Sequence, residues 1–230
     1  MITVDKLTKE FHLGSETILA LHDVTFQVNR GEFVTVAGPS GCGKSTLLMS
    51  LGGLIHPSRG TVKIGGVDVY SQSPRQLAEF RQKTVGFVFQ QFHLVPYLRA
   101  WENVALALML NGHDPKHHKT RALELLNRFD LGARGNHRPP QLSVGQQQRV
   151  AMARTLANDP EIILADEPTA SLDPTLSMSL MDTLKHLNQS GKTIILVTHS
   201  EGIASVGSRR LALVDGRLME AHRERAPMPC

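Results

Sequence analysis

The segment GPSGCGKST, at positions 38–46, has the residue types and spacing of a loop that binds phosphate groups. It matches the pattern G-x-x-x-x-G-K-[ST] between a buried-strand run and a helix-like run. Glycines let the backbone curl so that N–H groups point at phosphate oxygens, and the helix N-terminus adds a positive dipole. In such a loop Lys44 contacts the β and γ phosphates, and Ser45 offers a hydroxyl to Mg²⁺. The expected contacts are Gly38, Pro39, Ser40, Gly41, Cys42, Gly43, Lys44, Ser45 and Thr46.

Two acids at the end of another hydrophobic run could complete a site for phosphate chemistry. Asp166 and Glu167 follow the run EIILA, and ligands of a parallel sheet bind beyond the carboxyl ends of its strands. We expect Asp166 to hold Mg²⁺, through water, and Glu167 to polarise a water that attacks the γ-phosphate. Acids that end a strand are also commonly solvated caps, so this interpretation depends on the loop at 38–46.

The elements that must position these residues alternate between strands and helices. Strands are predicted at 22–28, 33–37, 85–89, 161–166 and 192–199, helices at 44–54 and 176–188, and hairpins at 60–69 and 210–219. The alternation predicts an α/β fold with a parallel sheet and crossover helices. Residues 97–158 look mostly helical, with Gly132 expected to end the helical pattern before it and 132–141 expected to be a flexible joint.

Composition favours a soluble globular chain. Its 230 residues suit one large domain or a core with an insertion, and 41% hydrophobic with 20% charged residues is ordinary for that class. The net charge of +4 and the basic cluster HRER at 222–225 hint at phosphates, nucleic acid or an anionic membrane, although a solvated surface is the simpler interpretation.

Cysteine content and apolar runs bear on the compartment. Cys42 and Cys230 are not expected to pair, which fits a reducing environment. The longest apolar run, 104–110, is far shorter than the roughly 20 residues that cross a bilayer. The first ten residues lack the apolar stretch of a signal peptide, so we do not expect the chain to span a membrane alone.

Four motifs in one order identify a resemblance. With GPSGCGKST, LSVGQQQR (142–149), IILADEPTASLD (162–173) and VTHS (197–200), the chain resembles the ATP-binding subunit of an ABC transporter over essentially its whole length. The resemblance implies the P-loop NTPase fold, with a mainly parallel sheet, an N-terminal antiparallel β subdomain and an inserted helical subdomain. It divides a single ABC ATPase domain, 1–230, into a core at 1–90 and 159–230 and a helical signature subdomain at 91–158.

The resemblance further implies that two copies of the chain hold ATP between them. Ser143, the backbone of Gly145, Gln146 and the helix N-terminus of one copy would contact the γ-phosphate in the loop of the other. The alternative for Ser143 is a plain N-cap without a ligand. Val144 stands where the family usually has the first glycine of a pair, and the sequence leaves open whether it faces the dimer contact or packs beneath it.

Four other positions carry roles only through the resemblance. Gln90 matches a glutamine that contacts Mg²⁺ and the attacking water, and His199 matches a switch histidine that contacts the γ-phosphate. Asp173, in the segment SLD, matches a contact with the opposite copy. Phe11 lies where an aromatic ring usually stacks on adenine, for which the ring face suffices. Without the resemblance, Gln90, His199 and Phe11 have ordinary structural interpretations.

Two further segments have open interpretations. The segment 90–104 resembles the part that receives membrane partners, with the exposed-looking Tyr97, Leu98 and Trp101 as a candidate groove, and packing within the helical region is the alternative. The histidines at 113, 117 and 118 show no ligand pattern, so we expect a solvated loop there.

The function implied is ATP hydrolysis, with ATP and Mg²⁺ as cofactors, by a homodimer on the cytoplasmic face of the inner or plasma membrane. Its partners would be integral membrane transporter subunits. The compact length resembles the lipoprotein-release, macrolide-export and cell-division group, which favours export or mechanical transmission; a subunit of a solute importer is the alternative. A soluble cassette acting on DNA or the ribosome, or a regulatory module without transport, is the rival class. One cassette without a long heptad run argues against the DNA or ribosome reading, so no nucleic-acid partner is expected.

Overall fold

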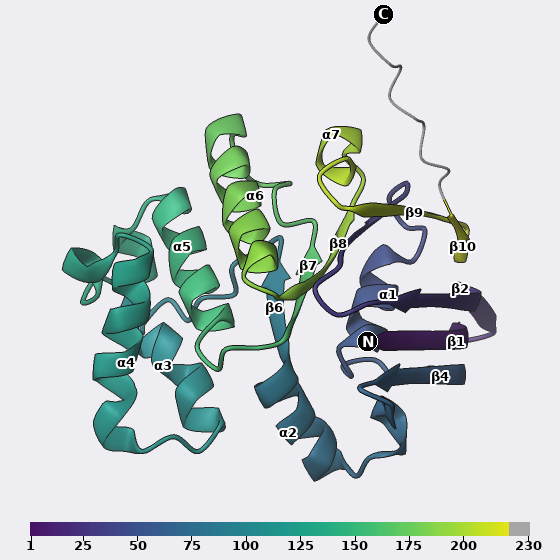
Figure 1. The fold of residues 1–230 in the computed structure, drawn as a ribbon, viewed down its shortest axis with the longest axis horizontal. Coiled ribbons are helices and arrows are strands. Elements are labelled where there is room, and N and C mark those ends of the chain that lie inside the picture. The colour runs from purple at the N-terminus through teal and green to yellow at the C-terminus, as the bar shows by residue number, and fades with distance from the viewer. Residues whose placement is uncertain (221–230) are drawn as a thin grey trace, which may run out of the picture.

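The structure is a computed structural model that describes residues 1–220, so the HRER cluster and Cys230 lie outside the described residues. It contains a six-stranded sheet, a four-stranded sheet and a group of helices (Figure 1). The strands are β1 (Ile2–Leu13), β2 (Glu16–Val28), β3 (Phe33–Ala37), β4 (Arg59–Ile64), β5 (Val67–Asp68), β6 (Val85–Phe89), β7 (Ile162–Asp166), β8 (Thr193–Thr198), β9 (Arg209–Val214) and β10 (Arg217–Glu220). The α-helices are α1 (Lys44–Leu51), α2 (Pro74–Thr84), α3 (Ala100–Leu110), α4 (Pro115–Arg128), α5 (Val144–Thr155), α6 (Pro174–Gln189) and α7 (Glu201–Ala204).

The six-stranded sheet has the order β10-β9-β3-β8-β7-β6 and is parallel except for β10. All residues of β3 and β8 are buried, as their apolar, β-branched sequences predict. The strand ends are level, because Ala37 pairs with Thr198, and Asp166 pairs with both Val197 and Phe89. This register brings whatever follows β3, β6, β7 and β8 to one edge of the sheet, and it confirms the predicted α/β class.

The four-stranded sheet has the order β2-β1-β4-β5 and is antiparallel throughout. The sequence pattern missed β1, because register shifts between Val4 and Leu7 and between Leu7 and Lys9 destroy its alternation. Lys6, with a φ of 47°, lies in the same irregular part of the strand. The hairpins predicted at 60–69 and 210–219 are both present.

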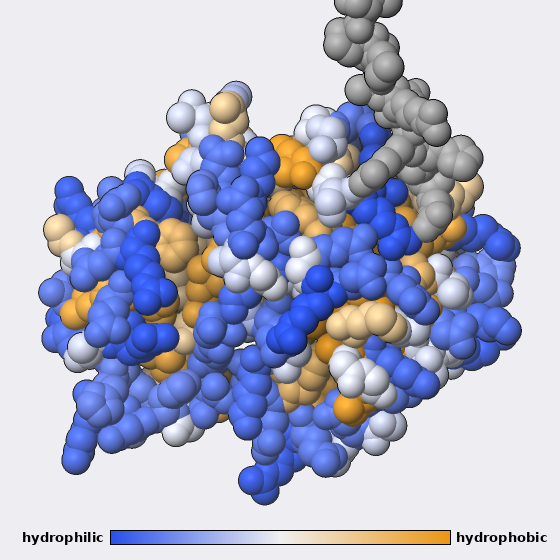
Figure 2. All heavy atoms as spheres, viewed as in Figure 1, coloured by the Kyte–Doolittle hydropathy of each residue, from blue (hydrophilic) through white to orange (hydrophobic). Residues whose placement is uncertain are grey.

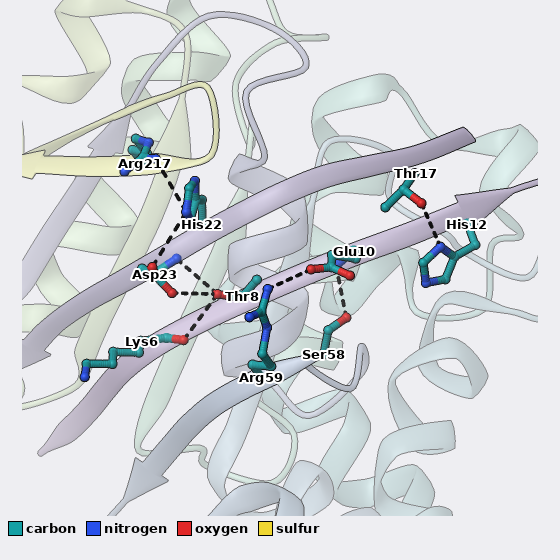
Figure 3. Close-up of polar contacts among 10 residues, drawn as sticks. All are labelled: Lys6, Thr8, Glu10, His12, Thr17, His22, Asp23, Ser58, Arg59 and Arg217. Atoms are coloured by element: carbon teal, nitrogen blue, oxygen red, sulfur yellow. Dashed lines mark hydrogen bonds and ion pairs between the residues drawn. The ribbon is translucent and has the colours of Figure 1, made fainter. Parts of the chain in front are cut away.

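A chain of polar contacts ties this sheet to the C-terminal hairpin (Figure 3). The buried Thr8 hydroxyl donates to Asp23 Oδ1 at 3.1 Å, and the Asp23 N–H donates back to Thr8 Oγ1 at 3.1 Å. The neighbouring His22 accepts from Arg217 through its ring Nε2 at 3.4 Å, and its backbone N–H donates to the Gly216 carbonyl at 2.8 Å. These contacts connect β1 and β2 with β10, so the two sheets are held together on one side of the phosphate loop.

Helices α3, α4 and α5 enclose a second hydrophobic cluster that includes Val104, Leu126 and Val150. The prediction that Gly132 ends a helix is wrong. Helix α4 ends at Arg128, and Asp130 makes the turn with a φ of 56°, a left-handed conformation that aspartate tolerates. Gly132 instead begins a short 3-10 turn, and a second such turn at Pro139–Gln141 gives the segment 132–141 regular local structure.

Two helix predictions also differ from the structure. Helix α1 ends at Leu51, earlier than expected, because Gly52 caps it and Gly53 follows with a φ of 70°. Helix α2 was not expected; it has no fully buried residue and holds to the core through the partly buried Leu77 and Phe80. None of the helices within residues 1–220 has the length and apolar character that a membrane crossing requires.

Candidate functional site

The loop from Gly38 to Gly43 connects β3 to α1 and is wedged between two strands. A Cβ atom on Gly38 would lie 2.1 Å from the Leu213 carbonyl oxygen in β9, and one on Gly43 would lie 2.2 Å from the Ala20 carbonyl oxygen in β2. Gly43 also has a φ of 103°, a conformation that only glycine adopts readily. Pro39, Ser40 and Gly41 form the exposed part of the loop, and the Cys42 thiol is buried.

Lys44 begins α1 and turns its ammonium back into the loop. Its side chain is 6% exposed, and Nζ donates to the carbonyls of Gly38 and Pro39, both at 2.8 Å. Nζ also lies 3.6 Å from Oε1 of Glu167. The ammonium is therefore held at the centre of the loop, beside the N-terminus of α1, where an anion is favoured.

The next helical residue, Ser45, connects the loop to the end of β7. Its hydroxyl donates to Asp166 Oδ1 at 3.0 Å. Burial raises the pKa of Asp166, the Ser45 hydrogen bond acts against that shift, and the neighbouring Glu167 adds to it. Within the described residues no group of three His, Cys, Asp or Glu side chains could hold a metal. A hydroxyl beside one carboxylate is a donor set that suits Mg²⁺, which takes few protein ligands and completes its shell with phosphates and water.

Glu167 is fixed by its backbone and by two cationic or polar neighbours. Its φ is 45°, a strained value for a residue with a side chain, and its N–H donates to the Val197 carbonyl at 3.0 Å. The side chain is 15% exposed, and Oε1 lies 2.9 Å from Nδ1 of His199, which follows β8. Lys44, Glu167 and His199 thus meet at the strand ends.

Gln90 leaves the sheet after β6, one strand beyond Asp166, and is exposed. Its carbonyl accepts a hydrogen bond from the Ser171 hydroxyl at 3.1 Å. No motif in the sequence predicts this link between Gln90 and the SLD segment. The sequence offers one weak signal for it. Ser171 comes five residues after Asp166, and the strand that ends before Gln90 is expected in the same sheet as the strand that ends at Asp166.

The LSVGQQQR segment starts α5, and its polar residues serve that helix. Ser143 Oγ accepts from the Gln146 N–H at 3.3 Å, and the Ser143 N–H donates to Gln146 Oε1 at 3.0 Å, which is a capping box. Val144 is 50% exposed, so it faces outward. Gly145 is buried, and a Cβ there would lie 2.5 Å from the Leu176 side chain in α6.

Asp173 caps α6 by accepting from the Leu176 N–H at 3.0 Å. Among residues 1–220, no hydrogen bond or ion pair joins Ser143, Gln146 or Asp173 to the loop at 38–46 of the same chain. The structure therefore brings the loop, the two acids and His199 into contact, places Gln90 at the end of the neighbouring strand, and leaves the starts of α5 and α6 apart from them.

Phe11 lies in β1, opposite Ile18 of β2, and is partly buried. The Lys9 ammonium lies 4.9 Å from the centre of its ring. Because Ala20 of β2 touches the loop at Gly43, Phe11 belongs to the hairpin that borders the loop.

Of the three residues expected to line a groove for a membrane partner, one is exposed. Tyr97 is 72% exposed and lines a cavity of about 660 Å³ with Arg99 and Arg138. Leu98 and Trp101 are only partly exposed, because Trp101 packs against the helical cluster. The solvated loop predicted around the histidines is wrong for His118, which is buried in α4 with Nε2 2.7 Å from the His113 carbonyl.

Comparisons with known proteins give one consistent result. The model of the family described as ABC transporter matches residues 21–170. An uncharacterized ABC transporter ATP-binding protein of Methanocaldococcus jannaschii, MJ1508, is 47% identical and covers 96% of this chain and 98% of its own length. The macrolide export ATP-binding/permease protein MacB of Burkholderia pseudomallei is 42% identical over 95% of this chain, which corresponds to 34% of MacB.

Two solved structures of the M. jannaschii cassette MJ0796 match the fold with a TM-score of 0.89. They are 42% and 43% identical and cover 98% of this chain and all of theirs. Both are described as dimeric, and one is a post-hydrolysis state bound to ADP and Pi.

Proposed function

Because the chain belongs to the ABC transporter family and has the fold of its ATPase cassettes, we propose that it hydrolyses ATP between two head-to-tail copies and drives a separate membrane subunit. The observation that carries the proposal is the meeting of Lys44, Ser45, Asp166 and Glu167 at the ends of β3 and β7. The Lys44 ammonium lies beside the Glu167 carboxylate, and the Ser45 hydroxyl lies beside the Asp166 carboxylate. The site thus holds a cation, a hydroxyl and two acids.

Phosphate binding uses the loop backbone and Lys44. The Lys44 ammonium exchanges its contacts with the Gly38 and Pro39 carbonyls for the β and γ phosphates. The loop N–H groups and the N-terminus of α1 supply further donors without moving, which keeps the reorganisation small. Ser40, Gly41, Cys42, Gly43 and Thr46 contribute to the same cradle.

Mg²⁺ fits beside Ser45 and Asp166, with Gln90 as a third ligand. Held by Ser45, Asp166 and Gln90, the ion would supply positive charge that offsets the negative charge developing on the phosphates. The partly buried Asp166 carboxylate would be stabilised by such a cation, since burial raises its pKa and so disfavours its ionised form.

Hydrolysis needs a base that faces the γ-phosphate, and Glu167 fits this role. Water oxygen attacks the γ-phosphorus, Glu167 accepts the water proton, and the bond to the oxygen shared with the β-phosphate breaks to give ADP and phosphate. His199, 2.9 Å from Glu167, orients the carboxylate and contacts the γ-phosphate. Phe11 offers its ring face to the adenine.

The second copy completes each site. Ser143, Gly145 and Gln146 of one copy present the N-terminus of α5 to the γ-phosphate held by the other, and Asp173 contacts the opposite copy. Support comes from the exposure of Val144 at this helix start and from the dimeric structures of MJ0796.

We place the membrane partner at the Tyr97 cavity, and the protein on the cytoplasmic face of the membrane as in a transporter's ATP-binding subunit. The likeness to MacB supports an exporter or a mechanical transmission system over a solute importer. Purification from membranes in mild detergent tests whether the protein has a membrane partner. Recovery of an integral membrane protein is the expected result, whereas recovery of nucleic acid alone would favour the soluble class.

The catalytic assignment is tested with Glu167→Gln. This variant keeps the size and one acceptor oxygen of the side chain but accepts no proton, so it should bind ATP, lose at least about 10²-fold in phosphate release and accumulate as an ATP-bound dimer. Light scattering and phosphate release measure the two effects. Near-normal hydrolysis by the variant would refute the role of Glu167.

A further inference from the structure

Arg154, in the last turn of α5, reaches the segment that follows Gln90. Its Nη1 and Nη2 atoms donate to the carbonyls of His93 and Phe92, at 2.6 and 2.7 Å. Burial lowers the pKa of this guanidinium, yet arginine keeps its charge in proteins, and no carboxylate pairs with Arg154 in the described part of the chain. The two carbonyls therefore compensate the charge, and hydrogen bonds from a charged donor are roughly twice as strong as neutral ones.

The segment 90–93 is held in place through its backbone. Among residues 1–220 the Gln90 side chain has no hydrogen-bond partner, and its backbone carbonyl accepts from the Ser171 hydroxyl. His93 has a φ of 47°, a conformation that a residue with a side chain keeps only where its surroundings hold it. Beyond the end of β6, the direction of Gln90 thus depends on two backbone contacts, one from Ser171 and one from Arg154.

Both contacts come from elements that have proposed roles at the second copy. Arg154 lies in the helix that starts beside Ser143, about 16 Å away along the axis. Ser171 lies two residues before Asp173, in the SLD segment. Within one chain, Gln90 is therefore joined to both parts that would meet the site of the other copy.

Helix α5 packs against two hydrophobic clusters, so it moves as one body. Val150 packs in the helical cluster, and Met152 packs with residues of β7, β8 and α6. Figure 2 shows hydrophobic residues among hydrophilic ones in the region of α5 and α6. At the end of the helix, Thr155 Oγ1 lies 2.7 Å from the Phe87 carbonyl oxygen of β6. A tilt that begins at the start of α5 therefore pivots at Thr155 and moves the neighbouring Arg154.

On the basis of the proposed function, we propose that Arg154 and Ser171 are positioning residues, which hold the backbone at Gln90 so that its side chain reaches Mg²⁺ and the attacking water. Contact of Ser143 with the γ-phosphate held by the second copy tilts α5, and the Arg154 guanidinium shifts the segment after Gln90 with it. Asp173 acts in the same way through Ser171. Gln90 therefore takes up its place only when the second copy is bound.

Arg154→Lys tests the first contact, because lysine keeps the charge but lacks the planar fork that reaches two carbonyls. We expect kcat for ATP hydrolysis to fall at least about tenfold, as is typical when a metal ligand loses the group that orients it, while KM changes less than about twofold. Arg81→Lys is the matched control. Arg81 of α2 is partly buried and donates to the Gly53 carbonyl at 2.9 Å, and its replacement should leave kcat unchanged. Circular dichroism and thermal melting establish that both variants are folded.

The Mg²⁺ requirement of dimer formation provides a readout besides hydrolysis. In Glu167→Gln protein with ATP, light scattering gives the Mg²⁺ concentration for half-maximal dimer formation. Adding Arg154→Lys should raise that concentration at least about tenfold, as adding Gln90→Ala should, whereas adding Arg81→Lys should not. An unchanged Mg²⁺ requirement overturns the proposal, because Arg154 then only stabilises the fold.

Gln90→Ala separates an effect that acts through Gln90 from a general one. In Gln90→Ala protein, adding Arg154→Lys should lower kcat less than about twofold, because the side chain that Arg154 positions is already gone. A second loss of the full size overturns the proposal, and so does a Gln90→Ala protein with the kcat of the wild type.

Ser171→Ala tests the second contact at an exposed position, so it leaves the core intact. Loss of a neutral hydrogen bond should lower kcat about two- to fivefold, and it should have no such effect in Gln90→Ala protein. This variant decides the matter if Arg154→Lys does not fold. Absence of hydrolysis by the wild type overturns the proposed function itself, whereas normal wild-type hydrolysis with additive losses overturns only the roles of Arg154 and Ser171.

Discussion

The carboxylate of Asp166 lowers the stability of the protein when no cation is bound, and it is the same group that we expect to hold Mg²⁺. Its pKa is raised because burial disfavours the charged form, and the hydrogen bond from Ser45 offsets only part of this. The folded protein therefore binds the Asp166 proton more tightly than the unfolded chain does. Ionised Asp166 lowers stability until a cation joins it.

Replacing Asp166 by Asn gives a pH-dependent result with a definite sign. Below the ordinary pKa of 3.8 the carboxyl is neutral in both states, so variant and wild type should differ little. As pH rises through the raised folded pKa, the wild type loses stability relative to Asn, and the difference then stays constant. Urea unfolding from pH 4 to 8 without nucleotide measures it. If the variant is less stable than the wild type at pH 7, burial does not outweigh the hydrogen bond from Ser45 in setting the pKa of Asp166.

Val144 is the one position where the signature segment departs from the resemblance, and its side chain is 50% exposed. A branched side chain there limits how closely the start of α5 approaches a phosphate, whereas glycine permits close approach. Val144→Gly should lower the ATP concentration for half-maximal hydrolysis about two- to fivefold, while destabilising the monomer by about 0.5–1 kcal/mol. Steady-state kinetics and urea melts separate the two effects. A raised ATP requirement would indicate that Val144 contributes contact area to the dimer.

At the scale of elements, the sequence predicts what is local and misses what depends on distant contacts. Strands β3 and β8 are apolar runs buried on both faces, so composition alone identifies them. Strand β1 was missed because its bulges are fixed by β2 and β4 on either side. The phosphate loop and the acids were predicted from contiguous motifs, whereas the link from Ser171 to Gln90 joins segments 81 residues apart.

Helix α1 packs its C-terminal end against β6 through Gly52. A Cβ on Gly52 would lie 2.0 Å from the Phe87 ring, which stacks on Phe89 with centroids 5.3 Å apart. Gly52→Ala should therefore destabilise the protein by about 1–3 kcal/mol through overpacking. Urea unfolding measures the loss.

Phe87→Leu provides the control in a double-mutant cycle. The smaller side chain leaves room for the added methyl group, so the double variant should be less destabilised than the sum of the two single variants. Additive effects would show that the added methyl group does not clash with the Phe87 ring.

At the scale of the whole molecule, one chain holds half of each proposed site. The loop, the acids and His199 meet at the edge of the six-stranded sheet, and the polar contacts of Figure 3 brace the β hairpin that borders the loop. Ser143 and Asp173 instead cap their own helices, at the starts of α5 and α6. A helix start with an exposed N-cap residue, as Ser143 and Asp173 both are, suits an anion brought by another copy.

Mixing two inactive variants tests this division. Lys44→Ala removes the phosphate-loop cation and Ser143→Arg blocks the start of α5, so each homodimer should be inactive. In a mixed dimer, the intact loop of the Ser143→Arg copy meets the intact Ser143 of the Lys44→Ala copy. An equal mixture with independent sites should therefore recover about a quarter of wild-type phosphate release, because half of the dimers are mixed and each has one intact site. A Ser143→Arg protein that hydrolyses ATP normally by itself would show that the second copy contributes nothing to the site.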